Sequence, residues 1–164
     1  MDFNLRMPPD RISDIIVEEF LGSRKTNDNI VEITVAVLGR TGQMVSMVPS
    51  ETLNDFGVLT VEEKFCKGGG TNLTPPPSFS SEMVYSIQKR ISAFSNQLGI
   101  DGYARIDAMY NIKSDELILI EVNSLPGLSP ATVTFTQALV TPGIRKKPSE
   151  FLKTLVDLKL EAIG

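Results

Sequence analysis

Two short stretches of this sequence combine residue types that can bind a metal ion and a phosphate group. Arg105 and Asp107 lie two residues apart, and Glu121 and Asn123 lie two apart further along the chain. In a strand, alternate side chains point to the same face. Carboxylate and amide oxygens suit Mg²⁺, and a guanidinium can hold a phosphate oxygen through two hydrogen bonds. The pattern is therefore compatible with a site that binds a divalent cation and a phosphate group.

The two stretches are predicted to be the strands of one hairpin, Tyr103–Tyr110 and Glu116–Asn123, joined by a five-residue turn over 111–115. If Tyr110 lies opposite Glu116, Arg105 lies opposite Glu121 and Tyr103 lies opposite Asn123. Asp107 is then diagonal to Glu121, at the roughly 7–8 Å typical of diagonal neighbours. Two carboxylates this close favour a shared cation, which relieves their repulsion.

The other face of the predicted hairpin is apolar and is expected to enter the core. Its members occupy the even positions: Ala104, Ile106, Ala108, Ile118, Ile120 and Val122. A purely structural interpretation also fits, in which Arg105 and Glu121 form a cross-strand ion pair contributing about 0.2–1 kcal/mol. A one-residue slip in register would move one set of polar side chains to the other face.

Composition excludes several kinds of active site. The chain has no histidine, so it cannot build a Ser-His or Cys-His nucleophile by itself. Its single cysteine, Cys66, excludes an internal disulfide and a cysteine-based zinc site. Carboxylates, Lys, Arg, backbone amides and an oxygen-bound metal ion remain.

Charge and hydropathy indicate a soluble globular protein. The net charge is −4 and the 16 Lys and Arg residues are scattered, which argues against nucleic acid as a partner. No apolar stretch reaches the roughly 20 residues of a membrane helix. The first ten residues do not resemble a signal peptide, so a cytoplasmic location is expected.

Periodicity predicts a single domain over 1–164, of the α+β class, with helices packed on a mainly antiparallel sheet. Gly68–Gly70 is expected to be a lid hinge rather than a P-loop, because no Gly-Lys-Ser/Thr follows. The expected strands besides the hairpin are Ile12–Leu21, Val31–Gly39, Met44–Pro49 and Leu59–Phe65, with a loop over Cys66–Pro77. Three helices are predicted. The first follows a cap at Ser80 or Ser81 and ends at Gly99, the second runs from Pro130 to Val140, and the third starts at Ser149. The third helix is expected to bury Phe151, Leu152, Leu155, Val156 and Leu158.

Four segments of the chain carry a combined signal: Val17-Glu18-Glu19-Phe20-Leu21, Glu32–Leu38, Glu63-Lys64-Phe65, and Gly102–Asp107 followed by Ile120–Pro130. In this order they resemble the C-terminal part of D-alanine–D-alanine ligases, members of the ATP-grasp superfamily. The resemblance covers nearly the whole chain and implies an ATP-grasp C-terminal lobe.

The resemblance implies roles for the hairpin residues and the loop after it. Asp107, Glu121 and Asn123 would be the magnesium ligands, with Glu121 bridging two ions, which Mn²⁺ could replace. Arg105 and the backbone N–H of Gly127 would stabilise the acyl-phosphate and the tetrahedral oxyanion.

The resemblance also implies nucleotide contacts elsewhere. Glu18 would accept from the adenine amino group, with Glu19 and Leu21 making backbone contacts. Glu32 would reach the ribose hydroxyls, and Lys64 would contact phosphate from a mobile lid. Without the family, these are ordinary surface side chains.

Thr132 or Ser129 matches the position whose hydroxyl holds the second substrate's carboxylate, although a hydroxyl at a helix start is often simply a cap. The stretches 22–30 and 72–77 resemble plant-type members, for which a plastid or cytosolic location would follow.

The implied activity is ATP-dependent formation of D-alanyl-D-alanine for peptidoglycan, the cell-wall polymer, by a full enzyme that is a homodimer. The family's N-terminal and central lobes are absent from this chain, so the chain alone is expected to be inactive. Two alternatives stay open: an ATP-grasp ligase that joins D-alanine to D-lactate or to an unrelated amine, and a non-catalytic interaction domain with the same fold.

Overall fold

The computed structural model describes residues 17, 29–53, 71–130 and 132–161. The predicted strand Leu59–Phe65, nearly all of the predicted strand Ile12–Leu21 and the Gly68–Gly70 run lie outside these residues. The described elements are β1 (Ile30–Gly39), β2 (Val45–Ser46), β3 (Ser50–Leu53), β4 (Thr71–Leu73), α2 (Ser81–Gln97), β5 (Gly102–Asn111), β6 (Glu116–Asn123), α3 (Val133–Val140) and α4 (Pro148–Glu161).

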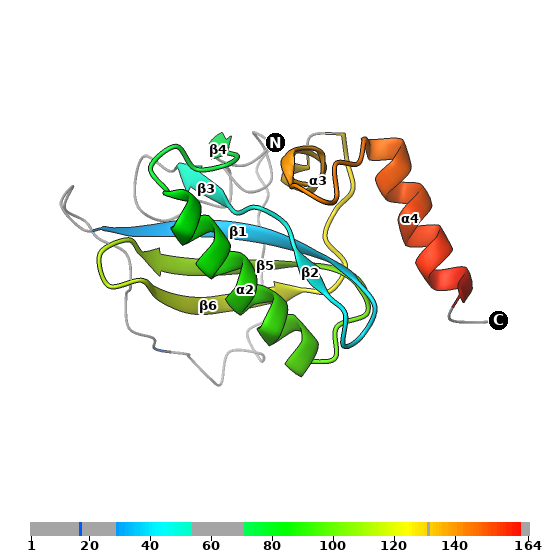
Figure 1. Cartoon of the computed structure of the whole chain (residues 1–164), viewed down its shortest axis with the longest axis horizontal. Coiled ribbons are helices and arrows are strands. Elements are labelled where there is room, and N and C mark those ends of the chain that lie inside the picture. The colour runs from blue at the N-terminus through cyan, green and yellow to red at the C-terminus, as the bar shows by residue number, and fades with distance from the viewer. Residues whose placement is uncertain (1–16, 18–28, 54–70, 131, 162–164) are drawn as a thin grey trace, which may run out of the picture.

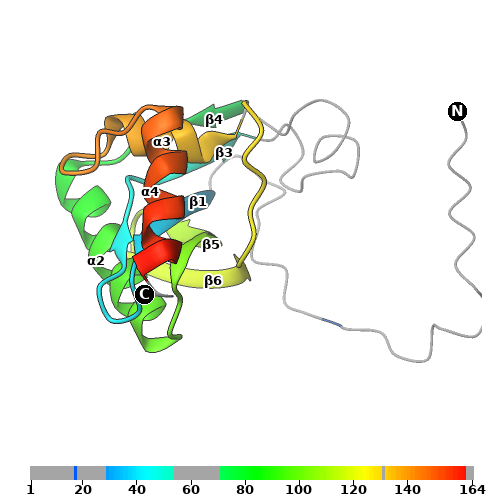
Figure 2. The same cartoon turned by 90° about the vertical axis from the view of Figure 1, so that its right-hand side faces the viewer.

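The described strands form one antiparallel sheet, and α2 crosses in front of it in Figure 1. The buried apolar residues of α2 belong to one core and those of α3 and α4 to another, on the opposite face. Its order is β4-β3-β1-β5-β6, and β2 pairs separately with β1. Figure 2 shows α2 on one side of the strands and the segment that leads from β6 to α3 rising on the other side. The expected α+β class with a mainly antiparallel sheet is confirmed.

β1 is the central strand because it pairs with β5 along its whole length, from Ile30 opposite Asn111 to Gly39 opposite Gly102. Residues 33–38 of β1 are all buried, which is how a strand behaves when both faces of its sheet are covered. The single strand predicted over Met44–Pro49 is wrong: β2 and β3 are separate short strands. Thr71–Leu73, predicted as loop, forms β4 on the edge.

The first hydrophobic core lies between the sheet and α2. Ser80 caps this helix, as predicted, by accepting a hydrogen bond from the Met83 amide at 3.3 Å. Gly99 follows the helix at φ +67, a conformation that glycine adopts without strain. The core side chains come from both layers: Ile33, Val35, Val37, Met44, Ile87, Ile91, Ala104, Ile106, Ala108 and Tyr110.

The second core lies on the opposite face, under α3 and α4. Phe135 and Phe151 meet edge to face at 5.9 Å between ring centroids, over Ala36 and Leu38 of β1. Only part of the predicted α4 stripe is correct, because Leu152 and Val156 are 42% and 57% exposed. α3 begins at Val133 rather than at Pro130.

Candidate functional site

The turn that joins β5 to β6 is tighter than the sequence predicted. Asn111 lies opposite Glu116, so the turn has one residue fewer than expected. The Asn111 side chain accepts hydrogen bonds from the amides of Lys113 and Ser114, at 3.0 and 3.2 Å. Asp115 closes the turn at φ +53, which Asp tolerates better than most residues.

A β-bulge then changes the register at the functional end of the hairpin. Ala108 lies opposite Leu119, but Asp107 lies opposite Glu121, which leaves Ile120 without a partner. Bulges of this kind insert one extra residue and are frequent beside active sites. Asp107 and Glu121 are therefore direct neighbours, and the predicted diagonal relation between them is wrong.

The predicted partners of two other residues are also corrected. Arg105 lies opposite Asn123 rather than Glu121, so the predicted pairing of Tyr103 with Asn123 is wrong as well. The core assignment changes for the same reason. Leu117 and Leu119 pack against the core in β6, while Ile120 is 54% exposed and Val122 is 37% exposed.

The four polar residues of the hairpin nevertheless share one face of the sheet, because residues directly opposite in an antiparallel pair point to the same side. A polar row crosses four strands on this face: Ser50 of β3, Thr34 of β1, Asp107 of β5 and Glu121 of β6. Glu32 lies on the same face, two residues before Thr34. The bulge keeps Glu121 in this row, since an unbroken ladder would turn it toward the core.

Asp107 is the most enclosed carboxylate of the row, with a side chain that is 13% exposed. Arg105 donates to both of its oxygens, from Nε to Oδ1 at 3.0 Å and from Nη2 to Oδ2 at 2.8 Å. Thr34 Oγ1 donates to Oδ1 at 2.6 Å. Three hydrogen bonds therefore fix this carboxylate.

Glu121 is more open, with a side chain that is 55% exposed. The Asn123 side-chain amide donates to Glu121 Oε1 at 3.2 Å, and Arg105 Nη2 lies 4.0 Å from the same oxygen. Arg105 thus lies within reach of both carboxylates.

Several charges act on the Arg105 guanidinium. Burial lowers the pKa of Arg105, but its hydrogen bond to Asp107 and the negative charges of Asp107, Glu121 and Glu32 outweigh burial and raise it. Arg105 is therefore a permanent cation among three carboxylates.

The chemistry of the donor set fits a hard divalent cation. Asp107 and Glu121 offer carboxylate oxygens from opposite positions, and Asn123 adds an amide oxygen. The described residues contain no group of three or more His, Cys, Asp or Glu side chains that could hold a metal ion. A cation here would thus rely on two carboxylates, one amide and ligands from outside, such as phosphate. Arg105 would have to give up at least one of its two hydrogen bonds to Asp107.

The loop after β6 places the Gly127 amide near this end of the sheet. Tyr103 donates from its hydroxyl to the Pro126 carbonyl oxygen over a long 3.3 Å. Burial raises the pKa of Tyr103, so its hydroxyl keeps its proton. The Pro126 carbonyl and the Gly127 N–H belong to one planar peptide unit and point in opposite directions. Tyr103, whose role the sequence analysis did not identify, therefore orients the Gly127 N–H.

The two hydroxyl candidates for the second substrate lie before α3. Thr132 is the N-cap residue of α3, but its side chain makes no capping hydrogen bond. The Thr132 amide donates to the Ser129 carbonyl at 2.9 Å, and Ser129 is exposed. The Thr132 hydroxyl is thus not used to hold the helix.

Four residues implied for nucleotide binding, Glu18, Glu19, Leu21 and Lys64, lie outside the described residues. Their roles stay predictions.

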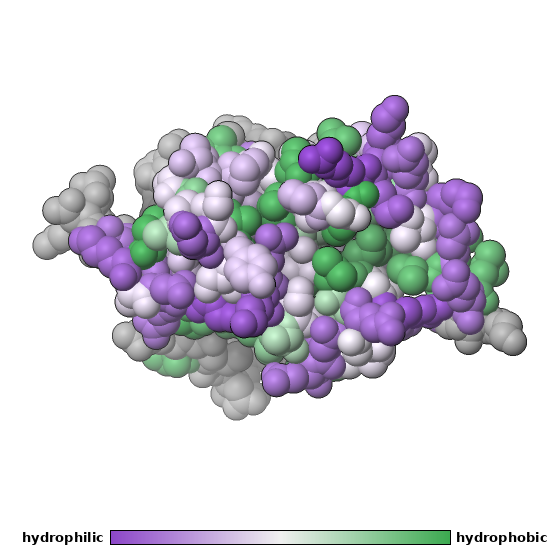
Figure 3. Space-filling model, in the orientation of Figure 1, coloured by the Kyte–Doolittle hydropathy of each residue, from purple (hydrophilic) through white to green (hydrophobic). Residues whose placement is uncertain are grey.

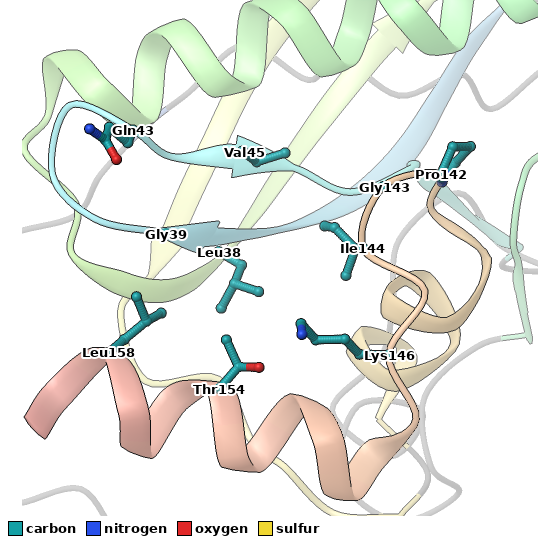
Figure 4. A pocket seen from close by; sticks show the side chains of 10 residues that line it. All are labelled: Leu38, Gly39, Gln43, Val45, Pro142, Gly143, Ile144, Lys146, Thr154 and Leu158. Carbon is teal, nitrogen blue, oxygen red and sulfur yellow. The ribbon is translucent and has the colours of Figure 1, made fainter. Parts of the chain in front are cut away.

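A separate cleft of about 330 Å³ lies between the β1–β2 hairpin and α4 (Figure 4). Its walls are mainly apolar, and Lys146 is the charged residue among those that line it. In Figure 3, apolar surface gathers in this region, with hydrophilic surface around it. The cleft includes no carboxylate, so it does not offer a second cation site.

Within the described residues, no helix is both long enough and apolar enough to cross a bilayer.

Sequence comparison relates the chain to one group of enzymes. The family described as "D-ala D-ala ligase C-terminus" matches residues 10–157. The D-alanine–D-alanine ligase of Halalkalibacterium halodurans is 28% identical over 152 residues, which is 90% of this chain and 45% of that protein. The corresponding ligase of Carboxydothermus hydrogenoformans is 30% identical over 133 residues, or 79% of this chain and 38% of that protein. The chain thus spans less than half the length of these relatives.

Solved structures agree on the fold. The VanG D-Ala:D-Ser ligase from Enterococcus faecalis aligns with a TM-score of 0.61 and 24% identity, over 78% of this chain and 36% of that chain. The D-alanine–D-alanine ligase from Bacillus anthracis, solved with ATP, aligns with a TM-score of 0.57 and 20% identity, over 80% of this chain and 38% of that chain.

Proposed function

The chain belongs to the family of D-alanine–D-alanine ligase C-terminal domains, and on that basis we propose that it is the nucleotide- and magnesium-binding part of an ATP-dependent ligase. The complete protein would join two D-alanine molecules in the cytoplasm. The observation that carries this proposal is the direct opposition of Asp107 and Glu121 on a face that also presents Arg105 and Asn123.

The proposed reaction has two steps. The carboxylate of one D-alanine attacks the γ-phosphorus of ATP, which forms an acyl-phosphate and releases ADP. The amine of a second D-alanine then attacks the acyl carbon, phosphate leaves, and the amine loses a proton. Bound magnesium would neutralise charge on the phosphate oxygens.

Each described residue has a defined part in this proposal. Asp107, Glu121 and Asn123 would hold one or two Mg²⁺ ions by their oxygens. Arg105 would turn from Asp107 to a phosphate oxygen, and the Gly127 N–H would donate to the oxyanion. Glu32 would bind the ribose, and Thr132 or Ser129 the second carboxylate. Substrate positioning and fixed charges can supply such catalysis without histidine.

The parts of the proposal that concern Glu18, Glu19, Leu21 and Lys64 come from sequence resemblance alone. They would contact the adenine ring and, for Lys64, phosphate. The rest of the polypeptide would supply the groups for the first D-alanine and the homodimer contacts.

The direct test is an ADP-release screen of amino acids with the full-length protein and its Asp107→Asn variant. The wild type should release ADP with D-alanine and form the dipeptide, and Asp107→Asn should lower the rate by at least about 100-fold, because a catalytic metal ligand has lost its charge. Unchanged phosphoryl transfer in the variant would favour an interaction role. Preference for D-lactate, or for an amine other than D-alanine, as the second substrate would identify the other ligase alternative.

A further inference from the structure

A buried threonine contacts the metal-binding carboxylate from the neighbouring strand. Thr34 lies directly opposite Asp107 and donates to its Oδ1 atom at 2.6 Å. Thr34 is 8% exposed, so water is largely excluded from this hydrogen bond. A hydrogen bond to a charged acceptor in such a place is stronger than one between neutral groups.

The Thr34 hydroxyl determines which oxygen of Asp107 is available to a cation. Thr34 engages Oδ1, whereas Oδ2 accepts only from Arg105 Nη2 among the described residues. When Arg105 turns toward a phosphate, the Thr34 hydrogen bond remains. Asp107 therefore keeps its orientation while Oδ2 becomes free to bind the ion.

Gln137 of α3 holds Thr34 from the other side. Its Nε2 donates to the Thr34 carbonyl and to Ser50 Oγ, both at 2.8 Å, and its Oε1 accepts from the Ala36 amide at 2.8 Å. Gln137 is fully buried. It thus joins β1 to β3 beside the point where Thr34 pairs with Ser50.

We propose that Thr34 is a positioning residue for Asp107, and that Gln137 anchors Thr34 so that the Oδ2 atom of Asp107 faces the cation shared with Glu121. This inference rests on the proposed function, since it assumes that Asp107 binds a metal ion. It adds a connection between α3, whose N-cap residue Thr132 carries a candidate substrate hydroxyl, and the proposed metal ligand Asp107 on β5.

The test measures Mn²⁺ affinity by electron paramagnetic resonance in the full-length protein, with a non-hydrolysable ATP analogue present. Thr34→Val keeps the shape and removes the donor, so Mn²⁺ should bind about 10–100-fold more weakly, as for other partners of metal ligands. Thr34→Ser restores the hydroxyl and should bind nearly as tightly as the wild type.

Thr134→Val is the matched control. Thr134 is also fully buried, and its hydroxyl has no hydrogen-bond partner among the described residues, so its loss should leave Mn²⁺ affinity unchanged. Thermal unfolding of each variant separates folding from metal binding. If Thr34→Val does not fold, Thr34→Cys, which keeps only a weak donor, should show the same direction of change.

The outcomes separate the two levels of the proposal. A wild-type protein that binds no Mn²⁺ would contradict the proposed function and this inference together. A wild type that binds Mn²⁺ while Thr34→Val binds it equally well would overturn the inference alone. An equal loss in Thr134→Val would also overturn it, because the effect would then come from packing.

Discussion

Arg105 and Asp107 lie two residues apart on β5 and are joined by two hydrogen bonds, which affects how a cation would bind. Both Asp107 oxygens accept from Arg105, so a cation and Arg105 compete for the same carboxylate. The Arg105 guanidinium also lies 4.0 Å from Glu121, which gives it a second acceptor when it moves. Under the proposed function, a bound metal ion and phosphate would replace the contacts between Arg105 and Asp107 with their own.

A second residue-scale consequence concerns Tyr103 and the Gly127 amide. Tyr103→Phe removes the donor to the Pro126 carbonyl, so the Gly127 N–H should lose its fixed direction. In the full-length protein, kcat for dipeptide formation should fall about 10-fold, less than the 10²–10³ lost when an oxyanion donor is removed outright, with KM for ATP little changed. Steady-state kinetics measures both constants.

Tyr85→Phe serves as the matched control for that variant. Tyr85 is 68% exposed on α2, on the other face of the sheet, so kcat should be unaffected. A Tyr103→Phe enzyme with full kcat would show that Tyr103 does not orient this amide.

At the scale of elements, the β-bulge in β6 decides which side chains reach the site. The run Leu117-Ile118-Leu119-Ile120 is apolar throughout, so it carries no alternation from which the register could be inferred. The sequence therefore predicted the strands and the shared polar face, but not the pairing. The shorter turn and the bulge are each one-residue effects, and together they turn the predicted diagonal of Asp107 and Glu121 into direct opposition.

Because of the bulge, we expect substitutions at neighbouring positions of β6 to change the free energy of unfolding by different amounts. Ile120→Ala should change the free energy of unfolding by about 0.5 kcal/mol or less, since Ile120 is largely exposed. Leu119→Ala should cost about 2 kcal/mol, because Leu119 packs against the first core. Urea unfolding measures both. A larger cost at Ile120 than at Leu119 would support the regular alternation that the sequence suggested.

Other elements differ in how well the sequence specified them. α2 has a cap, a stop and a regular apolar stripe, so local rules defined it closely. β2 and β3 pair with β1, β4 pairs with β3, and Gln137 of α3 contacts Ser50 of β3. Such long-range contacts leave no local pattern. Thr34 could have been noticed as a polar residue between apolar neighbours in a buried strand.

At the scale of the whole molecule, the chain spans less than half the length of its relatives. The described residues present the proposed metal-binding face and a candidate hydroxyl for the second substrate. By the family resemblance, groups for the first amino acid would lie in another part of the proposed enzyme. The chain is thus expected to hold part of a site rather than all of it.

This expectation can be measured with the 164-residue chain in isolation. It should release no ADP above background with D-alanine and ATP, whereas the full-length protein should turn over, because the first substrate has no complete binding site. A coupled ADP assay and chromatographic detection of dipeptide provide the measurement. Dipeptide formed by the isolated chain would show that this domain is sufficient.

The central claim is that opposite residues of a bulged hairpin hold one divalent ion. Crystals of the full-length protein with Mn²⁺ and an ATP analogue test it through anomalous scattering. The account predicts a peak within coordination distance of both Asp107 and Glu121, roughly 2.0–2.3 Å, with Arg105 turned from Asp107 toward phosphate. A peak bound elsewhere, with the Arg105–Asp107 pair intact, would contradict it.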